Sequence, residues 1–135
     1  MIHGIGTDII EVHRIKDVMD RDIGFLENIF TKDEIAYCDK MKLKQQHYAA
    51  RFSAKEAFMK ALGTGWRYGI TFADIEVYHD SLGNPYIRLH GKAAELAKQK
   101  GITSIHVSLS HTKELATALV VLEKKDGILQ SGGDL

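Results

Sequence analysis

The sequence predicts a single α+β domain in which an antiparallel β-sheet packs with helices. Its 135 residues are the length of one domain, long enough to bury a core without disulfides. Hydrophobic residues make up 44% of the chain and charged residues 27%, an ordinary globular mixture that argues against disorder. Helical spacing of apolar residues dominates the first half of the chain, and short alternating segments around turns follow it.

The chain is expected to begin with a strand and a short helix. Residues 1–10 place isoleucines among glycines, a pattern typical of a strand. Gly4 and Gly6 interrupt this strand and indicate a bend or the close approach of another backbone segment. Residues 11–19 follow as a short helix, because their apolar side chains recur on one side at helical spacing.

Two further helices are expected in the first half of the chain. Thr31 and Glu34 have the spacing of a capping box, so a helix begins at this point and runs to about Met41. The next helix covers about residues 46–62 and is ended by Gly63. Its small and apolar residues recur at helical spacing and predict a buried stripe. The stripe consists of Ala54, Ala57, Phe58, Ala61 and Leu62.

The second half predicts a hairpin, a short helix and two further strands. The expected elements are strands at 75–79 and 86–90, a helix at 92–100, and strands at 105–109 and 116–122. Residues 116–122 are almost all apolar, so this strand is expected to be buried on both faces or at an interface. The domain spans residues 1–124, and residues 125–135 are expected to form a flexible tail without function.

Composition excludes several classes of protein. The 18 basic and 18 acidic residues cancel, which disfavours a broadly cationic binder of nucleic acid or membranes. One cysteine, Cys38, allows neither an intrachain disulfide nor a cysteine-based zinc cluster, and we interpret it as an inert or semi-buried thiol. No apolar run approaches the roughly 20 residues of a membrane span, and the first residues do not resemble a signal peptide. A cytoplasmic location is therefore expected.

The neutral net charge hides an uneven distribution along the chain. Residues 17–39 carry seven acids and two bases, whereas residues 40–60 carry six bases and one acid. A basic stretch in a neutral protein favours a compact anionic ligand over a long polyanion. The alternative is that these bases only form a solvated surface.

The segment Arg51–Gly65 contains the strongest candidate for chemistry. Glu56 and Lys60 lie one helical turn apart, on a face roughly opposite the buried stripe. A carboxylate that holds Mg²⁺ beside an ammonium that holds phosphate is what phosphoryl transfer needs. The alternative is an exposed ion pair between the two side chains, worth about 0.3–0.5 kcal/mol.

Asp8 is the second candidate, because it is an acid inside an apolar, strand-like run. A charged group in such a place needs a partner or a metal. Asp8 and Glu56 together have the composition of a two-carboxylate Mg²⁺ site that leaves positions for water and substrate phosphates. The alternative is that Asp8 caps the helix that follows it.

The third candidate is the pair of hydroxyls and the imidazole of Ser108, Ser110 and His111, where a strand enters a turn. A nucleophilic Ser–His pair is disfavoured, because no G-x-S-x-G elbow surrounds these residues. Contacts with a phosphate or a base fit better, and an ordinary polar hairpin end is the alternative.

Three blocks of the chain resemble the holo-acyl-carrier-protein synthases, the small bacterial type of 4′-phosphopantetheinyl transferase. They are residues 4–9 (GIGTDI), residues 51–65 with the element K-E-A-x-x-K, and residues 108–112 (SLSHT). The resemblance covers about residues 1–124. It implies the α+β fold of that family and a homotrimer whose active sites lie between adjacent subunits.

The resemblance implies that 4′-phosphopantetheine passes from coenzyme A to a serine of apo-acyl carrier protein, in fatty acid biosynthesis. The other product is adenosine 3′,5′-bisphosphate. The metal ligands of the family, for Mg²⁺, fall on Asp8 and Glu56, and its lysine one turn later falls on Lys60. Residues associated with the coenzyme A nucleotide fall on Arg51 and His111. Further candidate contacts to coenzyme A are Lys42, Lys44, Gly63, Gly65 and Thr112.

The chemistry of these residue types agrees with that reaction. Mg²⁺ neutralises charge on a pyrophosphate, and Lys60 stabilises or protonates the departing bisphosphate. The carrier's serine is the nucleophile, so Glu56 is the leading candidate for a general base. In the family, basic residues near the first helix receive the acidic carrier. Here acids are interleaved with those bases, so docking is expected to shift to Arg14, Arg21, Met19 and Phe25.

Two other functions are compatible with the same residues. A non-catalytic trimer that binds coenzyme A or a nucleotide as a regulator would use the basic stretch and His111. It would not need Asp8 and Glu56 as a metal pair. A structural oligomer would use the motif residues only as surface ion pairs.

Overall fold

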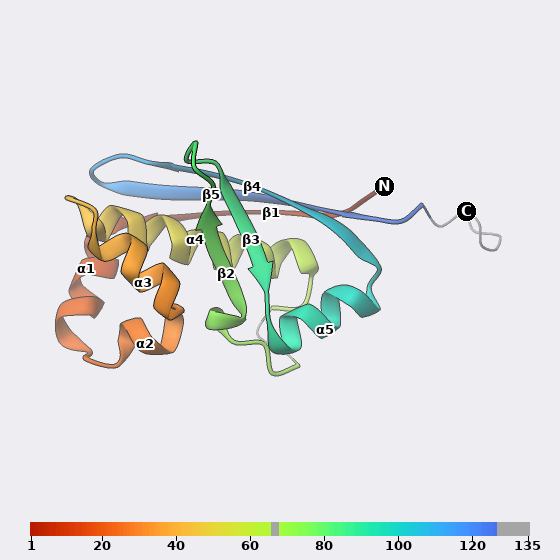
Figure 1. The fold of residues 1–135 in the computed structure, drawn as a ribbon, viewed down its shortest axis with the longest axis horizontal. Coiled ribbons are helices and arrows are strands. Elements are labelled where there is room, and N and C mark those ends of the chain that lie inside the picture. Colours follow the sequence, from red (N-terminus) through yellow and green to blue (C-terminus); the bar gives the residue numbers. More distant parts are fainter. Residues whose placement is uncertain (66–67, 127–135) are drawn as a thin grey trace.

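A computed structural model describes residues 1–65 and 68–126 of the chain (Figure 1). A three-stranded antiparallel sheet has the order β1-β5-β4, and a separate antiparallel pair has the order β2-β3. The strands are β1 (Ile2–Glu11), β2 (Ile75–His79), β3 (Pro85–Leu89), β4 (Ile102–His111) and β5 (Leu115–Lys124). The helices are α1 (Val12–Arg21), α2 (Phe25–Ile29), α3 (Lys32–Asp39), α4 (Lys44–Leu62) and α5 (Gly91–Gln99), with a short 3-10 helix η1 (Phe72–Asp74).

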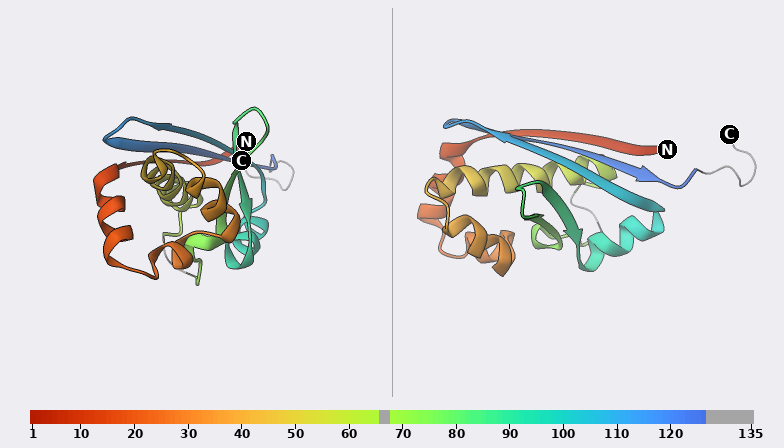
Figure 2. Two further views of the ribbon diagram at one scale, coloured as in Figure 1. Left: turned by 60° about the vertical axis from the view of Figure 1, so that its left-hand side comes forward. Right: turned by 45° about the horizontal axis from the view of Figure 1, so that its top comes forward.

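The described helices lie on one side of the three-stranded sheet (Figure 2). The long helix α4 runs along this side, and β1 and β5 make the most extensive contacts with it. Within the sheet, the first strand of the chain pairs with the last, with Gly6 opposite Val120 and Asp8 opposite Ala118. The other side of the sheet bears no described helix (Figure 2).

Two glycines allow α4 to lie directly on β1. A β-carbon at Gly4 would overlap the carbonyl oxygen of Ala61, and one at Gly6 would overlap that of Ala57. The prediction of a close backbone approach at these glycines is therefore confirmed. The contact fixes α4 against β1 at the level of Asp8, two residues beyond Gly6.

The core has two parts, which meet along α4. One part lies between α4, the sheet and β2, and contains the predicted stripe of Ala54, Ala57, Phe58, Ala61 and Leu62. The other part surrounds the first half of α4 and is contributed largely by α1 and α3. Burial of this stripe, at 0–3% exposure, leaves the opposite side of α4 free to carry polar residues.

A buried ion pair ties α4 to the elements around it. Lys55 Nζ donates to Glu34 Oε1 at 2.8 Å, and both side chains are fully buried. The same ammonium donates to the carbonyl oxygens of Phe72 and Ile75, and Glu34 Oε2 accepts from the backbone N–H of Val77. Because every charge in this network is hydrogen-bonded, it holds α3, α4 and β2 in one arrangement.

Most predicted elements are confirmed, often to within two residues. Thr31 and Glu34 form the complete capping box of α3, and Gly63 ends α4 in the left-handed conformation, with φ of 87°. Cys38 is fully buried, and burial raises the pKa of its thiol to about 12, so the prediction of an inert thiol agrees with the structure. Helix α2 was not expected, because its five residues are too few to show a period.

Strand β5 was predicted to be buried either on both faces or at an interface, and the first of these is not what the structure shows. Ala116, Ala118, Val120 and Leu122 are buried, whereas Leu119 on the other face is 40% exposed. Burial on both faces is therefore wrong for the isolated chain, and the interface stays a prediction. The expected tail lies mostly at residues 127–135, outside the described part of the chain. Within the described residues, no helix is both long and apolar enough to span a membrane.

Candidate active site

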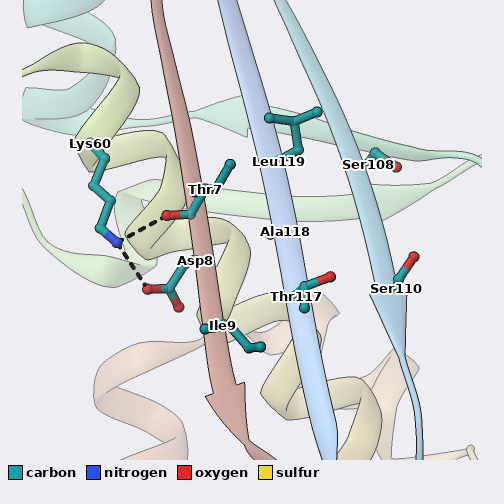
Figure 3. A pocket seen from close by; sticks show the side chains of 9 residues that line it. All are labelled: Thr7, Asp8, Ile9, Lys60, Ser108, Ser110, Thr117, Ala118 and Leu119. Carbon is teal, nitrogen blue, oxygen red and sulfur yellow. Dashed lines mark hydrogen bonds and ion pairs between the residues drawn. The ribbon is translucent and has the colours of Figure 1, made fainter.

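Asp8 lies on β1 at the edge of the sheet, beside α4. Its Oδ2 accepts a hydrogen bond from Ser53 Oγ at 3.1 Å. Its Oδ1 lies 3.4 Å from Lys60 Nζ (Figure 3). The Asp8 side chain is 17% exposed, so the partners offset its cost of burial. The alternative that Asp8 caps α1 is wrong, because Glu11 occupies the N-cap position and makes no side-chain cap.

Lys60 reaches from α4 across to β1. Its Nζ donates to the carbonyl oxygen of Thr7 at 2.9 Å and pairs with Asp8 (Figure 3). The lysine side chain is 58% exposed and keeps access to solvent. Among the described residues its ion pair is with Asp8, so the alternative of a simple Glu56–Lys60 ion pair along the helix is not what the structure shows.

Glu56 is half-buried and lines the same cavity as Asp8. Burial raises the pKa of Glu56, and the neighbouring charge of Asp8 adds to this effect, while Lys60 opposes it. A cation bound between the two carboxylates would relieve the repulsion of Glu56 by Asp8.

The donor set of Asp8 and Glu56 fits Mg²⁺. This ion binds one or two protein carboxylates and completes its octahedron with water and substrate phosphates. No group of three or more His, Cys, Asp or Glu side chains suited to a metal occurs in residues 1–65 and 68–126. A cation at Asp8 and Glu56 would therefore keep coordination positions for a phosphorylated substrate.

Asp8 borders two cavities. One, of about 670 Å³, lies over the helix-free side of the sheet and is lined by Lys60, Ser108, Ser110 and Leu119 among others (Figure 3). The other, of about 350 Å³, lies between α1 and α4. Its lining includes Arg14, Phe25, Phe52 and Glu56. Asp8, at their junction, is placed to contact ligands from either side.

Arg51 and His111 line a third cavity, of about 250 Å³, which contains neither Asp8 nor Glu56. Arg51 is 1% exposed, and its Nη2 donates to His79 Nδ1 at 2.9 Å. His111 Nδ1 lies 2.9 Å from Gln46 Oε1. The centroid of its ring lies 5.2 Å from the centroid of the His47 ring.

The side-chain alternation of β4 separates the third predicted cluster. Ser108 and Ser110 line the cavity on the helix-free side, whereas His111 lines the cavity near Arg51. A Ser–His nucleophilic pair is therefore absent from this described cluster, in agreement with the sequence argument against it. Within one chain, the predicted metal residues and the predicted nucleotide residues belong to different cavities.

The remaining predicted contacts are more peripheral. Lys42 is exposed, and Lys44 Nζ lies 3.9 Å from Asp39 Oδ1. Neither lysine is among the residues that line the cavity of Arg51. Thr112 Oγ1 accepts from the backbone N–H groups of Glu114 and Leu115 and so shapes the β4–β5 turn. Gly63 and Gly65 both have positive φ and form the exposed bend after α4.

Two of the four predicted carrier-binding residues line the cavity of Glu56. Arg14 and Phe25 line the cavity that also contains Glu56. Met19 packs at the margin of the core, and Arg21 Nε donates to the carbonyl oxygen of Asp17. Another base of α1, Lys16, is paired with Asp20 at 3.0 Å, so at least one of the interleaved acids neutralises a base of this surface.

Five residues near these cavities escaped sequence reasoning: Tyr37, Gln46, His47, Ser53 and His79. His47 stands four residues before Arg51, a spacing that places both on one helix face and was available as a signal. Tyr37 and His79 come from α3 and β2, and no sequence period shows that these elements meet α4.

Comparison with known proteins agrees with this geometry. A model of the 4'-phosphopantetheinyl transferase superfamily matches residues 4–120. A protein of Syntrophus aciditrophicus named holo-[acyl-carrier-protein] synthase is 47% identical over 124 residues, which are 91% of this chain and 97% of that protein.

Solved structures show the same fold. The crystal structure of a holo-[acyl-carrier-protein] synthase from Neisseria meningitidis superposes with a TM-score of 0.84 at 35% identity, over 92% of this chain and 100% of that one. The Bacillus anthracis synthase in complex with CoA (3',5'-ADP) gives a TM-score of 0.77 at 39% identity, over 93% and 99% of the two chains.

Proposed function

This chain belongs to the 4′-phosphopantetheinyl transferase superfamily, with holo-[acyl-carrier-protein] synthases as relatives, and we propose that it uses coenzyme A and Mg²⁺ to modify apo-acyl carrier protein. The observation that carries this proposal is the meeting of Asp8, Glu56 and Lys60 at the edge of β1. In the proposed reaction the carrier's serine receives 4′-phosphopantetheine, and adenosine 3′,5′-bisphosphate is released. The proposed setting is fatty acid biosynthesis in the cytoplasm.

The metal would be held by the carboxylates of Asp8 and Glu56. When bound, Mg²⁺ neutralises negative charge on the pyrophosphate and favours its cleavage. Ser53 supports this arrangement, because its hydroxyl donates to Asp8 Oδ2 and orients the carboxylate.

Two side chains would handle charge and protons. Lys60 Nζ is anchored at Thr7 and Asp8 and still exposed, so it is placed to bind a phosphate oxygen and stabilise the departing bisphosphate. The carrier's serine supplies the attacking oxygen, and Glu56 is the carboxylate available to accept its proton.

The carrier would approach over α1. The cavity that contains Glu56 opens there between apolar side chains such as Phe25 and the guanidinium of Arg14. Arg14 has no ion pair among the described residues, in contrast to Lys16, which Asp20 neutralises. Arg14 is therefore the base best suited to an acidic carrier, with Phe25 as its apolar neighbour.

A homotrimer would unite the two separated groups of residues. The helix-free side of the sheet exposes Ile5, Ile9, Leu115 and Leu119 by 40–61%, and such an apolar surface suits association between copies. One coenzyme A carries both a pyrophosphate and a 3′-phosphate. We propose that the pyrophosphate lies at Asp8 of one subunit and the 3′-phosphate near Arg51 of its neighbour.

The transfer is tested by incubating the protein with coenzyme A, Mg²⁺ and apo-acyl carrier protein, and then weighing the carrier. A gain of about 340 Da, the mass of one phosphopantetheine arm, is expected, and chelation of Mg²⁺ is expected to abolish it. Tight binding of coenzyme A without any gain in carrier mass would instead support a regulatory binding protein.

The shared site is tested by mixing two inactive variants, Asp8→Ala and Arg51→Ala, under conditions that exchange subunits. Mixed trimers would contain some sites with both intact residues, so part of the activity is expected to return. If the mixture stays as inactive as the separate variants while subunits demonstrably exchange, each chain builds its own site.

A further inference from the structure

Arg51 is a buried cation without a counter-charge. The residue is 1% exposed, and no Asp or Glu pairs with it among the described residues. Its Nε is buried and has no hydrogen-bond partner in the described part of the chain. An unpaired guanidinium in such a place is costly, and an anion that enters the adjoining cavity would relieve that cost.

Two side chains from other elements hold the guanidinium in place. Its central carbon lies 4.3 Å from the ring centroid of Tyr37 on α3, a cation–π contact. Its Nη2 donates to His79 Nδ1 at 2.9 Å, at the end of β2. The rings of Tyr37 and His79 also stack, with centroids 4.8 Å apart and planes 7° from parallel.

This arrangement restrains both partners of the hydrogen bond. Arginine has only donors, so His79 must accept through Nδ1 and is neutral in this contact. Burial and the charge of Arg51 hold the pKa of His79 at about 4, in agreement with that state. The carboxylate of Asp80 follows next in the chain, but it accepts from Leu82 and Asn84 in the β2–β3 turn.

The cavity next to Arg51 suits a small anion. At about 250 Å³ it accommodates a phosphate group, and its lining contains His47 and His111 but no Asp or Glu. A neutral His79 leaves the single positive charge of Arg51 undiminished, whereas a carboxylate at the same position would cancel it. Phosphate is recognised by the planar array of guanidinium donors, which must be oriented before binding to give full affinity.

We propose that Tyr37 and His79 are positioning residues that orient the Arg51 guanidinium toward a phosphate monoester and thereby select coenzyme A over its 3′-dephospho form. This inference rests on the proposed function, since it names the residues that recognise one end of that substrate. Tyr37 and His79 act through Arg51 and do not take part in the transfer itself.

The test measures binding of two nucleotides by calorimetry, without the carrier protein. Adenosine 3′,5′-bisphosphate carries the 3′-phosphate, and adenosine 5′-monophosphate lacks it. The unaltered protein is expected to prefer the bisphosphate. His79→Leu is expected to weaken bisphosphate binding by about 10-fold, the scale of one hydrogen bond to a charged group, and to leave monophosphate binding within about twofold.

Conservative variants distinguish positioning from general damage. His79→Gln offers an amide oxygen to Arg51 and is expected to restore part of the preference. Tyr37→Phe keeps an aromatic ring and is expected to retain it, whereas Tyr37→Leu is expected to lose it. Thermal unfolding of each variant checks that the fold persists, and the Tyr37 pair carries the test if His79→Leu does not fold.

The possible outcomes separate this inference from the proposed function. Equal losses for both nucleotides, no loss at all, or no preference in the unaltered protein would overturn the positioning role. Selective loss for the bisphosphate would support it. If that selectivity appears but the carrier never gains mass, the transfer is refuted and the phosphate recognition stands.

Discussion

Replacing Gly6 with alanine tests whether the contact between β1 and α4 builds the active site. The new β-carbon would overlap the carbonyl oxygen of Ala57 and lie 2.7 Å from the backbone nitrogen of Ala61. Ordinary contact begins at 3.4 Å, so α4 must retreat by at least about 0.7 Å at this point. Both obstacles are backbone atoms of a packed helix, which cannot rotate away as a flexible side chain would.

The expected cost follows from this geometry. Overpacking of a core costs roughly 1–3 kcal/mol, and a backbone obstacle places Gly6→Ala at the upper end, about 3 kcal/mol. The retreat also separates Glu56 and Lys60 on α4 from Asp8 on β1. Because a misplacement of about 1 Å costs about 100-fold in rate, the variant that still folds is expected to lose activity on that scale.

The assay combines urea unfolding with carrier modification at a temperature where both proteins are folded. Gly24→Ala is the matched control, since its β-carbon would meet Asn28 Nδ2 at 3.4 Å and its φ of −84° suits any residue. The control is expected to change stability by less than about 0.5 kcal/mol. If Gly6→Ala unfolds at the same urea concentration as the control and retains full activity, the close contact has no role in building the site.

The other expected outcomes concern single side chains. Glu56→Gln is expected to abolish carrier modification without changing the unfolding temperature, and near-normal turnover would remove Glu56 from the site. Lys60→Ala is expected to lower kcat more than the affinity for coenzyme A, and a loss confined to affinity would show a binding role only. Cys38 is expected to resist a thiol reagent until the protein unfolds, because burial raises its pKa to about 12, and rapid labelling of the native protein would contradict its burial. Stability is expected to fall as the pH drops from about 6.5 to about 4, because burial and Arg51 lower the pKa of His79 in the folded state and protonation then favours unfolding. If His79→Gln shows the same fall over that pH range as the unaltered protein, His79 is not its cause.

Local signals predicted much of the fold and part of the site. Thr31 and Glu34 define the start of α3 through contacts three residues apart, and Gly63 ends α4 through its own conformation. Glu56 and Lys60 share a helix face for the same reason, because helical spacing alone places them there. Such features depend on neighbours within one or two turns and are therefore visible in the sequence.

Long-range packing determines the rest and left less trace in the sequence. Arg51 belongs to the same sequence motif as Glu56. It nevertheless lines a different cavity from Glu56, one to which α3 and β2 contribute. Its partners Tyr37 and His79 stand 14 residues before it and 28 residues after it. Likewise, an apolar run showed that β5 is buried but not that one of its faces would remain open, because only the assembled layers decide which face is covered.

The pairing of β1 with β5 has a consequence for how the protein is made. In this register Ile2 lies opposite Glu123 and Glu11 lies opposite Leu115. The strand that is synthesised first can therefore pair only after the strand that is synthesised last has been made. During translation β1 is an isoleucine-rich strand with an unpaired edge, the kind of segment that associates with other chains. Asp8 sits on that strand opposite Ala118, so a nascent chain without residues 115–124 lacks the strand that pairs with β1 at the proposed metal site. The proposed active site therefore depends on the two ends of the domain meeting.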